Sequence, residues 1–430
     1  MKTTFTCLAL SVALLGAPAF ADPRLAQQHG VASDRLERLH RYLEEMTAPA
    51  GARYLGAVSL IARDGVIVDV AAYGYRDIGR TEKLKSDAIF RIYSMSKTVT
   101  AAAVIMLVEE GKIGLEDPVA RFIPQFKTMQ VIDGGVARPA AGPITVRQLL
   151  THTAGFAVYG APDDPATAMF MRADVGGAAD LAGYVERLAK TPLGHDPGRE
   201  FHYDGVATQV AARIVEIAAH MRFDDFLRTR LFEPLRMPDT GFEVAPAQRG
   251  RIAAMTVTNA AGRLVEAPRQ PGELPAPGER MRPYFSAAGG LYSTAADYAR
   301  FAQMLLNGGS LDGVSVLSRK GVELMMRNHL TQLSMPIAGL NPGESFGLGG
   351  SVVVDAARRG RLGSDGQFGW SGAGGTWYTI DPRERLVAVL MTQHLPVGAP
   401  SDPRKPIVDY SNLLYQSLQP LPRQRAMAGE

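Results

Sequence analysis

Two serines of this 430-residue chain lie in patterns that would suit a nucleophile, and the first is Ser94, followed three residues later by Lys97. On a helix this separation places both side chains on one face. Serine is a weak nucleophile until a neighbour removes its proton, and a lysine shielded from water can accept or relay that proton. The Ser-x-x-Lys spacing therefore predicts a serine nucleophile with a lysine partner. The alternative is a helix cap followed by a solvated lysine.

The segment that follows Ser94 favours the chemical interpretation. Residues Ser94 to Glu110 have a helical pattern that Gly111 ends, and their composition after Lys97 is almost entirely apolar. A helix that is apolar all round is buried, so Lys97 would be shielded from water. The N-terminus of the helix also provides a favourable field for an anionic oxygen.

The second candidate is Ser345, in the Gly-x-Ser-x-Gly sequence of residues 343–347. This pattern marks a nucleophile when it forms a sharp turn between a strand and a helix. Here a loop precedes the motif and a β-rich run follows it, so the required context is missing. We do not expect Ser345 to be the nucleophile.

The elements that must position these residues follow a simple order. We expect an N-terminal helix and a hairpin with an Asp-Gly turn, then a long helical middle, and then strands and a final helix. The expected ranges are helices Ser33–Glu45 and Pro406–Leu418 and strands Tyr54–Ala62, Val66–Tyr75, Gly347–Val354, Gly375–Ile380 and Leu386–Thr392.

Strands from both ends of the chain most simply join in one antiparallel sheet. The predicted fold class is therefore α+β, an antiparallel sheet flanked by helices with an inserted helical lobe. We expect the sheet lobe to comprise residues of about 22–93 and 340–430, and the helical lobe about 94–339.

Composition excludes several classes of protein. With 46% hydrophobic and 21% charged residues and a net charge of +3, the chain is typical of a folded globular protein. The arginines are dispersed among acidic residues, so we expect no nucleic-acid partner. A single cysteine, Cys7, excludes a disulfide framework or a thiolate zinc cluster within the chain. The histidines lack the spacing of a helical zinc site, and no glycine cluster has the lysine of a phosphate loop, so we expect no metal and no cofactor.

Residues 1–21 have the pattern of a signal peptide. Lys2 precedes an apolar run from Leu8 to Leu15, and Ala19-Phe20-Ala21 matches a signal-peptidase site. We expect cleavage after Ala21 and export to the periplasm or the medium. Cys7 lies before the apolar run, which argues against a lipid anchor. No later apolar run reaches the roughly 18 residues of a membrane helix, so we expect no membrane anchor.

Several segments, in order, resemble the serine β-lactamase and penicillin-binding-protein superfamily. The similarity is strongest to its class C β-lactamase branch and to the family VIII carboxylesterases, and it runs from about Ser33 to Leu418. The resemblance implies a β-lactamase/transpeptidase-like fold. The segments that carry it are Phe90–Thr98, Leu149–Gly155, Pro197–Tyr203, Ala288–Asp297 and Trp370–Thr376.

The resemblance also assigns roles to residues. It implies that Ser94 is the acylated nucleophile, Lys97 its proton partner and Tyr203 the general base and acid. Without the motif order, Tyr203 would be interpreted as an interfacial core residue. The backbone N–H groups of Ser94 and Ala373 would form the oxyanion hole. His152 is expected to orient a turn rather than to belong to a catalytic triad.

Two motifs depart from the family pattern. Tyr-x-Asn is replaced by Tyr203-Asp204-Gly205, which lacks the amide. Lys-Thr-Gly is replaced by a substrate-binding sequence of Trp370, Ser371 and Gly372, similar to the Trp-x-Gly form of family VIII esterases. The missing cation removes a partner for the carboxylate of penicillins and of peptide C-termini.

These features predict an exported serine hydrolase that cleaves carboxylic esters through an acyl-enzyme on Ser94. Its partner would be a small-molecule ester or lactam substrate. The alternative in the same fold is a penicillin-recognising D-alanyl peptidase or a weak β-lactamase. A third hypothesis is a binding protein that has the fold but no turnover, for which Gly205 is the main argument.

Overall fold

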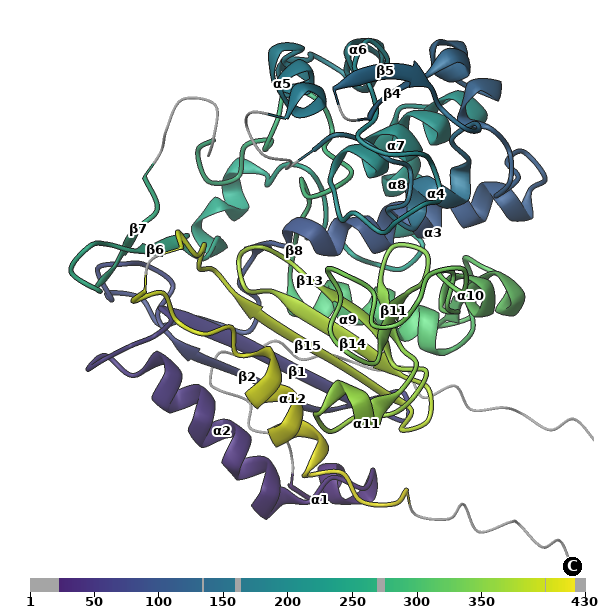
Figure 1. Ribbon diagram of the computed structural model, residues 1–430. Coiled ribbons are helices and arrows are strands. Elements are labelled where there is room, and N and C mark those ends of the chain that lie inside the picture. The colour runs from purple at the N-terminus through teal and green to yellow at the C-terminus, as the bar shows by residue number, and fades with distance from the viewer. Residues whose placement is uncertain (1–22, 134, 159–163, 269–274, 399, 422–430) are drawn as a thin grey trace, which may run out of the picture.

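The computed structural model describes residues 23–421, except residues 134, 159–163, 269–274 and 399. The predicted leader and its cleavage site after Ala21 lie outside these residues. A seven-stranded sheet in the order β11-β12-β13-β14-β15-β1-β2 forms the centre of the molecule (Figure 1). Its strands are β1 (Gly56–Arg63), β2 (Val66–Gly74), β11 (Glu344–Phe346), β12 (Ser351–Val353), β13 (Phe368–Ser371), β14 (Trp377–Asp381) and β15 (Leu386–Thr392).

The sheet joins the two ends of the chain. Strand β1 pairs antiparallel with β15 from the C-terminal part, with Leu60 opposite Val389. All other neighbouring pairs in this sheet are antiparallel as well. The hairpin of β1 and β2 turns at Asp64 and Gly65, both with positive φ, as the Asp-Gly signal predicts. The predicted α+β class with an antiparallel sheet is confirmed.

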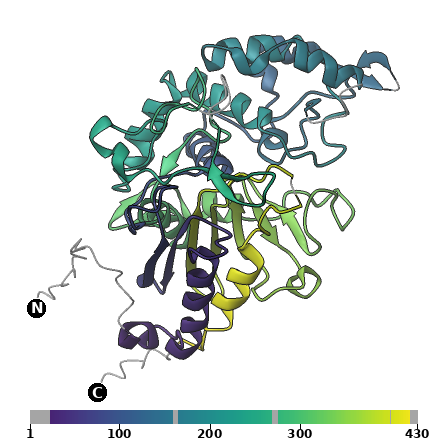
Figure 2. The ribbon, with the colours of Figure 1, turned by 90° about the vertical axis from the view of Figure 1, so that its left-hand side faces the viewer.

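Helices cover both faces of the sheet. On one face lie α2 (Ser33–Thr47) and α12 (Ile407–Tyr415), side by side in Figures 1 and 2. The hydroxyls of Ser59 and Tyr410 are 2.7 Å apart and link the sheet to α12 within a buried apolar layer. On the other face α9 (Ala295–Leu306) packs against β1, β14 and β15. This helix falls within the sequence range expected for the helical lobe, but its apolar side covers the sheet.

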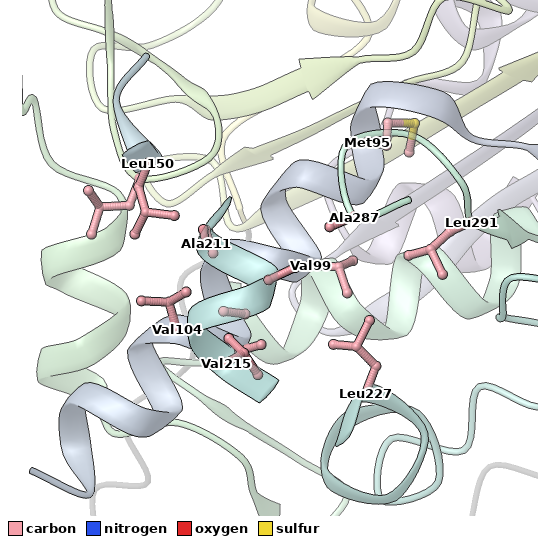
Figure 3. Close-up of a cluster of buried hydrophobic side chains, with 14 of the residues drawn as sticks. Met95, Val99, Val104, Leu150, Ala211, Val215, Leu227, Ala287 and Leu291 are labelled. Atoms are coloured by element: carbon pink, nitrogen blue, oxygen red, sulfur yellow. The ribbon is translucent and has the colours of Figure 1, made fainter. Parts of the chain in front are cut away.

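The helix α3 (Ser96–Glu109) lies between the sheet and the remaining helices (Figure 1). Every residue from Ser96 to Leu107 is buried, which agrees with its apolar composition. Figure 3 shows Val99 and Val104 of α3 among side chains from several other segments. The helices α7 (Val206–Ala219) and α10 (Arg319–Met325) pack against it, and α4 (Val146–Leu150) and α8 (Phe223–Leu227) pack in turn against α7.

Shorter elements complete the described part of the chain. The helices are α1 (Pro23–Gln28), α5 (Pro165–Arg172), α6 (Leu181–Leu188) and α11 (Ala356–Arg359). The strands outside the sheet are β3 (Phe90–Arg91), β4 (Gln130–Asp133), β5 (Val136–Pro139), β6 (Thr256–Thr258), β7 (Leu264–Glu266), β8 (Tyr292–Ser293), β9 (Ser310–Leu311) and β10 (Val314–Ser315).

One predicted strand, Gly347–Val354, is wrong in detail. The structure forms β11 before it and β12 within it, and the residues between them make the turn of a hairpin. Gly349 of this turn has φ +77° and packs directly on α3, where its carbonyl accepts a 2.7 Å hydrogen bond from the Thr98 hydroxyl. The glycines allow a close backbone approach, which an uninterrupted strand would prevent. Strand β13 was not predicted.

Among the described residues, none of the helices has the length and apolar character needed to cross a membrane.

The contact of the hairpin with α3 predicts an unequal cost for two glycine substitutions. A β-carbon at Gly349 would lie 2.8 Å from the carbonyl oxygen of Lys97, whereas a β-carbon at Gly360 would meet no atom within 4 Å. Both glycines have positive φ, +77° and +70°. We expect Gly360→Ala to lower the free energy of unfolding by about 1 kcal/mol. We expect Gly349→Ala to cost about 2 kcal/mol more through overpacking. Urea unfolding of both variants measures the difference, and equal costs would contradict the packing argument.

Candidate active site

Ser94 lies in a 3-10 turn, Tyr93–Met95, directly before α3. The pairing of β3 with β8 holds the chain that leads into this turn. Tyr93 has φ +44°, a left-handed conformation that is uncommon for a bulky residue and is often found at functional sites. The turn leaves the Ser94 side chain half-buried at the N-terminus of α3.

Lys97 is buried in the first turn of α3, with 4% of its surface exposed. Its Nζ donates hydrogen bonds to the Ser94 hydroxyl at 3.2 Å and to the Ala288 carbonyl at 2.9 Å. The structure therefore brings the serine and lysine of the Ser-x-x-Lys motif into direct contact. A solvated lysine, the other interpretation of the sequence, does not match this burial.

Tyr203 reaches the same place from the loop before α7. The Nζ atom of Lys97 lies 4.8 Å from the centre of the Tyr203 ring. The indole N–H of Trp370 donates a 3.0 Å hydrogen bond to the Tyr203 hydroxyl, and the two rings are 5.1 Å apart. Tyr203 thus lies between the buried amine and a neutral donor from β13.

The segment around Ala288 provides a polar partner for Lys97, in place of the amide that the Tyr203-Asp204-Gly205 sequence lacks. A β-carbon at Gly205 would contact the β-carbon of Ala288 at 3.5 Å, so a side chain there would point toward this segment. Glycine leaves that space open, and the main-chain carbonyl of Ala288 accepts the hydrogen bond from Lys97. The role of Ala288 cannot be predicted from the sequence, because a main-chain acceptor leaves no trace in the residue type.

The turn after β13 lies against the Ser94 segment. A β-carbon at Gly372 would come within 2.3 Å of the Ile92 carbonyl, so only glycine fits here, and the Thr376 hydroxyl donates to the same carbonyl at 3.2 Å. This contact places the exposed Ala373 beside the Tyr93–Met95 turn. Within the described part of the chain, the backbone N–H groups of Ser94 and Ala373 have no acceptor. They are available to a ligand oxygen.

The His152 ring packs against the Tyr203 ring. It is buried, has φ +54°, and its ring centre lies 4.7 Å from that of Tyr203 and 5.2 Å from that of Phe346. The Asp204 N–H donates to its Nδ1 at 3.4 Å. Burial lowers the pKa of the imidazole, against the raising effect of Asp204. The sequence predicts that His152 orients a turn; in the structure its Nδ1 accepts from the Asp204 N–H and its ring packs against Tyr203 and Phe346.

Phe201 and Phe346 form the aromatic support around His152, and sequence reasoning missed both. The spacing of Phe201 and Tyr203, two residues apart in an extended segment, was the available signal.

Ser345 lies within β11 and is buried. Its hydroxyl donates a 2.6 Å hydrogen bond to Asn328. A strand in place of a strand-to-helix turn confirms that the nucleophile-elbow context is missing. Within the described ranges, no group of three or more His, Cys, Asp or Glu side chains could hold a metal ion.

The fold and the site define the class of this protein. The sequence matches the beta-lactamase family over residues 40–409, and the chain belongs to this family, within a superfamily of hydrolases. Protein Rv1367c of Mycobacterium tuberculosis is 36% identical over 357 residues, which cover 79% of this chain and 86% of that protein. Esterase EstB of Burkholderia gladioli is 28% identical over 356 residues, again 79% of this chain and 86% of the relative.

A solved structure shows the same fold. EstCE1, described as a hydrolase with promiscuous acyltransferase activity, superposes with a TM-score of 0.73 at 25% identity. The match covers 89% of this chain and 99% of that one.

The buried state of His152 predicts a pH dependence of stability. Its pKa is lowered from 6.5 in the folded protein, so the unfolded chain binds a proton that the folded chain does not. The stabilisation is present above pH 6.5 and is lost as the pH falls toward the folded pKa, by up to about 1.4 kcal/mol per pH unit. We expect His152→Asn, whose side chain tolerates positive φ, to show a shallower decline in free energy of unfolding between pH 7.5 and 5.5. Burial also lowers the pKa values of His329 and His394. Their contribution to the pH dependence of the free energy of unfolding is the same in the wild type and in the variant. An unchanged decline would contradict this assignment.

Proposed function

We propose that this protein is an exported serine hydrolase that cleaves carboxylic esters through an acyl-enzyme on Ser94. The observation that carries the proposal is the 3.2 Å hydrogen bond from the buried Lys97 amine to the Ser94 hydroxyl. Export to the periplasm or the medium is supported by the signal-peptide pattern of residues 1–21.

The reaction begins with removal of the Ser94 proton by the Lys97 and Tyr203 pair. The oxygen attacks the ester carbonyl carbon, and the developing oxyanion accepts hydrogen bonds from the N–H groups of Ser94 and Ala373. The bond to the alcohol oxygen breaks, and Tyr203 returns the proton to the leaving alcohol. Water, deprotonated by the same pair, then attacks the acyl group, and the acid leaves as Ser94 regains its proton.

Trp370 favours neutral esters over penicillins and peptides. Its indole N–H donates to the Tyr203 hydroxyl, a hydrogen bond that strengthens when that oxygen becomes anionic. Because the indole carries no charge, it offers no partner for a substrate carboxylate. Trp370, Ser371 and Gly372 would then line the substrate along the end of β13.

The named relatives support the same chemistry. One is an esterase, and the neighbour EstCE1 is a hydrolase that also transfers acyl groups. An acyl-enzyme accounts for both outcomes, since the acyl group can pass to water or to an alcohol.

Replacement of Ser94 tests the nucleophile. We expect Ser94→Ala to lower kcat for p-nitrophenyl acetate at least about 1,000-fold, because the variant lacks the hydroxyl that the proposal acylates. The matched control is Ser345→Ala, which should retain ester hydrolysis because the buried hydroxyl of that serine donates to Asn328 and to no group of the candidate site. Circular dichroism checks that both variants fold.

Two labelling experiments separate the rival functions. A fluorophosphonate should label the wild type but not Ser94→Ala, and absence of labelling in the wild type would favour a binding protein. Nitrocefin turnover or trapping of fluorescent penicillin faster than ester hydrolysis would favour a lactamase or peptidase.

Replacement of Trp370 tests its hydrogen bond to Tyr203. Trp370→Phe keeps an aromatic ring but removes the donor, so we expect kcat for esters to fall by about 10- to 100-fold with little change in KM. The control is Trp377→Phe, because Trp377 packs against Tyr410 of α12 and donates to no group of the candidate site. Equal kcat values for the two variants would show that the hydrogen bond has no catalytic role.

A further inference from the structure

A second cluster of charged side chains links β11 to α11 and to the residues that follow this helix. Arg359 and Arg361 belong to the connection between β12 and β13, and Glu344 begins β11. The three side chains are 5%, 11% and 4% exposed, respectively. Such burial is unusual for arginine and glutamate unless the charges are paired.

The pairing within this cluster is uneven. Arg359 Nε donates to Glu344 Oε1 at 2.7 Å, and Arg361 Nη2 donates to the same oxygen at 2.6 Å. The other oxygen, Oε2, accepts a 2.8 Å hydrogen bond from Asn341. Arg359 Nη1 also donates to the Gln367 side-chain oxygen at 2.6 Å. Two guanidinium groups thus share a single carboxylate.

One positive charge is left over. Among the described residues, no acidic side chain other than Glu344 forms an ion pair with Arg359 or Arg361. Arg361 Nε is buried and has no acceptor in the described part of the chain. Burial, and then the neighbouring Arg361, lowers the pKa of Arg359. A buried cation in excess of its partners destabilises a protein until an anion pairs with it.

A cavity opens beside these groups. It has a volume of about 280 Å³ and is lined by both arginines, Glu344, Asn341, Gln367 and the exposed Lys405. It also reaches Trp370 and Ser371 of β13, the end of the strand that the proposed function assigns to substrate binding. Lys405 adds a third cation, and the planar forks of the arginines match the oxygens of phosphate or carboxylate groups.

We propose that this cavity binds a small free oxyanion, a phosphate or a carboxylate, held by Arg361 and Arg359 with Lys405 at the edge. The anion lies in the cavity lined by both guanidinium groups, which together carry one positive charge more than the carboxylate they share. The inference is independent of the proposed ester hydrolysis, because its measurement involves no turnover.

Calorimetric titration of the purified protein at constant ionic strength tests the site, with inorganic phosphate and succinate as separate probes. We expect one saturable site per chain for at least one probe, and the tighter probe identifies the preferred oxyanion. Arg361→Gln should weaken that binding at least about tenfold, as expected for loss of charge-assisted hydrogen bonds. The matched control is Arg358→Gln on the same helix, whose side chain is 69% exposed and pairs with Asp355, and it should bind as the wild type does.

A second variant covers the case in which Arg361→Gln does not fold. Lys405→Gln alters an exposed side chain and should weaken binding several-fold while leaving thermal unfolding without ligand unchanged. The proposal is overturned if the wild type shows no saturable heat with either probe. It is equally overturned if the wild type and the foldable cavity variants bind with the same affinity.

Discussion

The amine of Lys97 is buried at the start of α3, where the apolar surroundings leave it dependent on a few polar partners. Its hydrogen bonds go to Ser94 and to the main chain at Ala288, and its remaining side faces the Tyr203 ring. A buried charge without such partners would cost several kcal/mol. The contacts that satisfy the buried amine therefore also bring the Ser94 hydroxyl, the Lys97 amine and the Tyr203 ring together at one point.

The sheet brings the other half of the site to that point. Strand β13 presents the Trp370 indole to Tyr203, and the glycine turn after it lies against the Ile92 carbonyl. The hairpin of β11 and β12 also contacts the first turn of α3, because the Thr98 hydroxyl donates to the Gly349 carbonyl. The Thr98 hydroxyl in turn accepts from Tyr378 of β14, so α3 is fixed to the sheet on both sides of Lys97.

The two unusual sequence motifs have a common structural consequence. Gly205 removes a side chain beside Ala288, and Trp370 replaces a cation with a neutral donor. The amine of Lys97 already donates to protein groups, Ser94 and the Ala288 carbonyl. This is the reason that the proposed substrates are neutral rather than anionic. The excess positive charge of this region lies instead in the cavity of Arg359 and Arg361.

The sequence by itself determined what depends on neighbours in the chain. Helical spacing placed Ser94 beside Lys97, the apolar run after them predicted the burial of α3, and Asp64-Gly65 marked the hairpin. Only the tertiary structure decided the contacts between distant residues, since a pattern of residue types does not specify which surfaces meet. Trp370 and Tyr203 are 167 residues apart, and Lys97 and Ala288 are 191 apart. Their distances follow from the packing of β13 and α7 around α3, which local propensity does not encode.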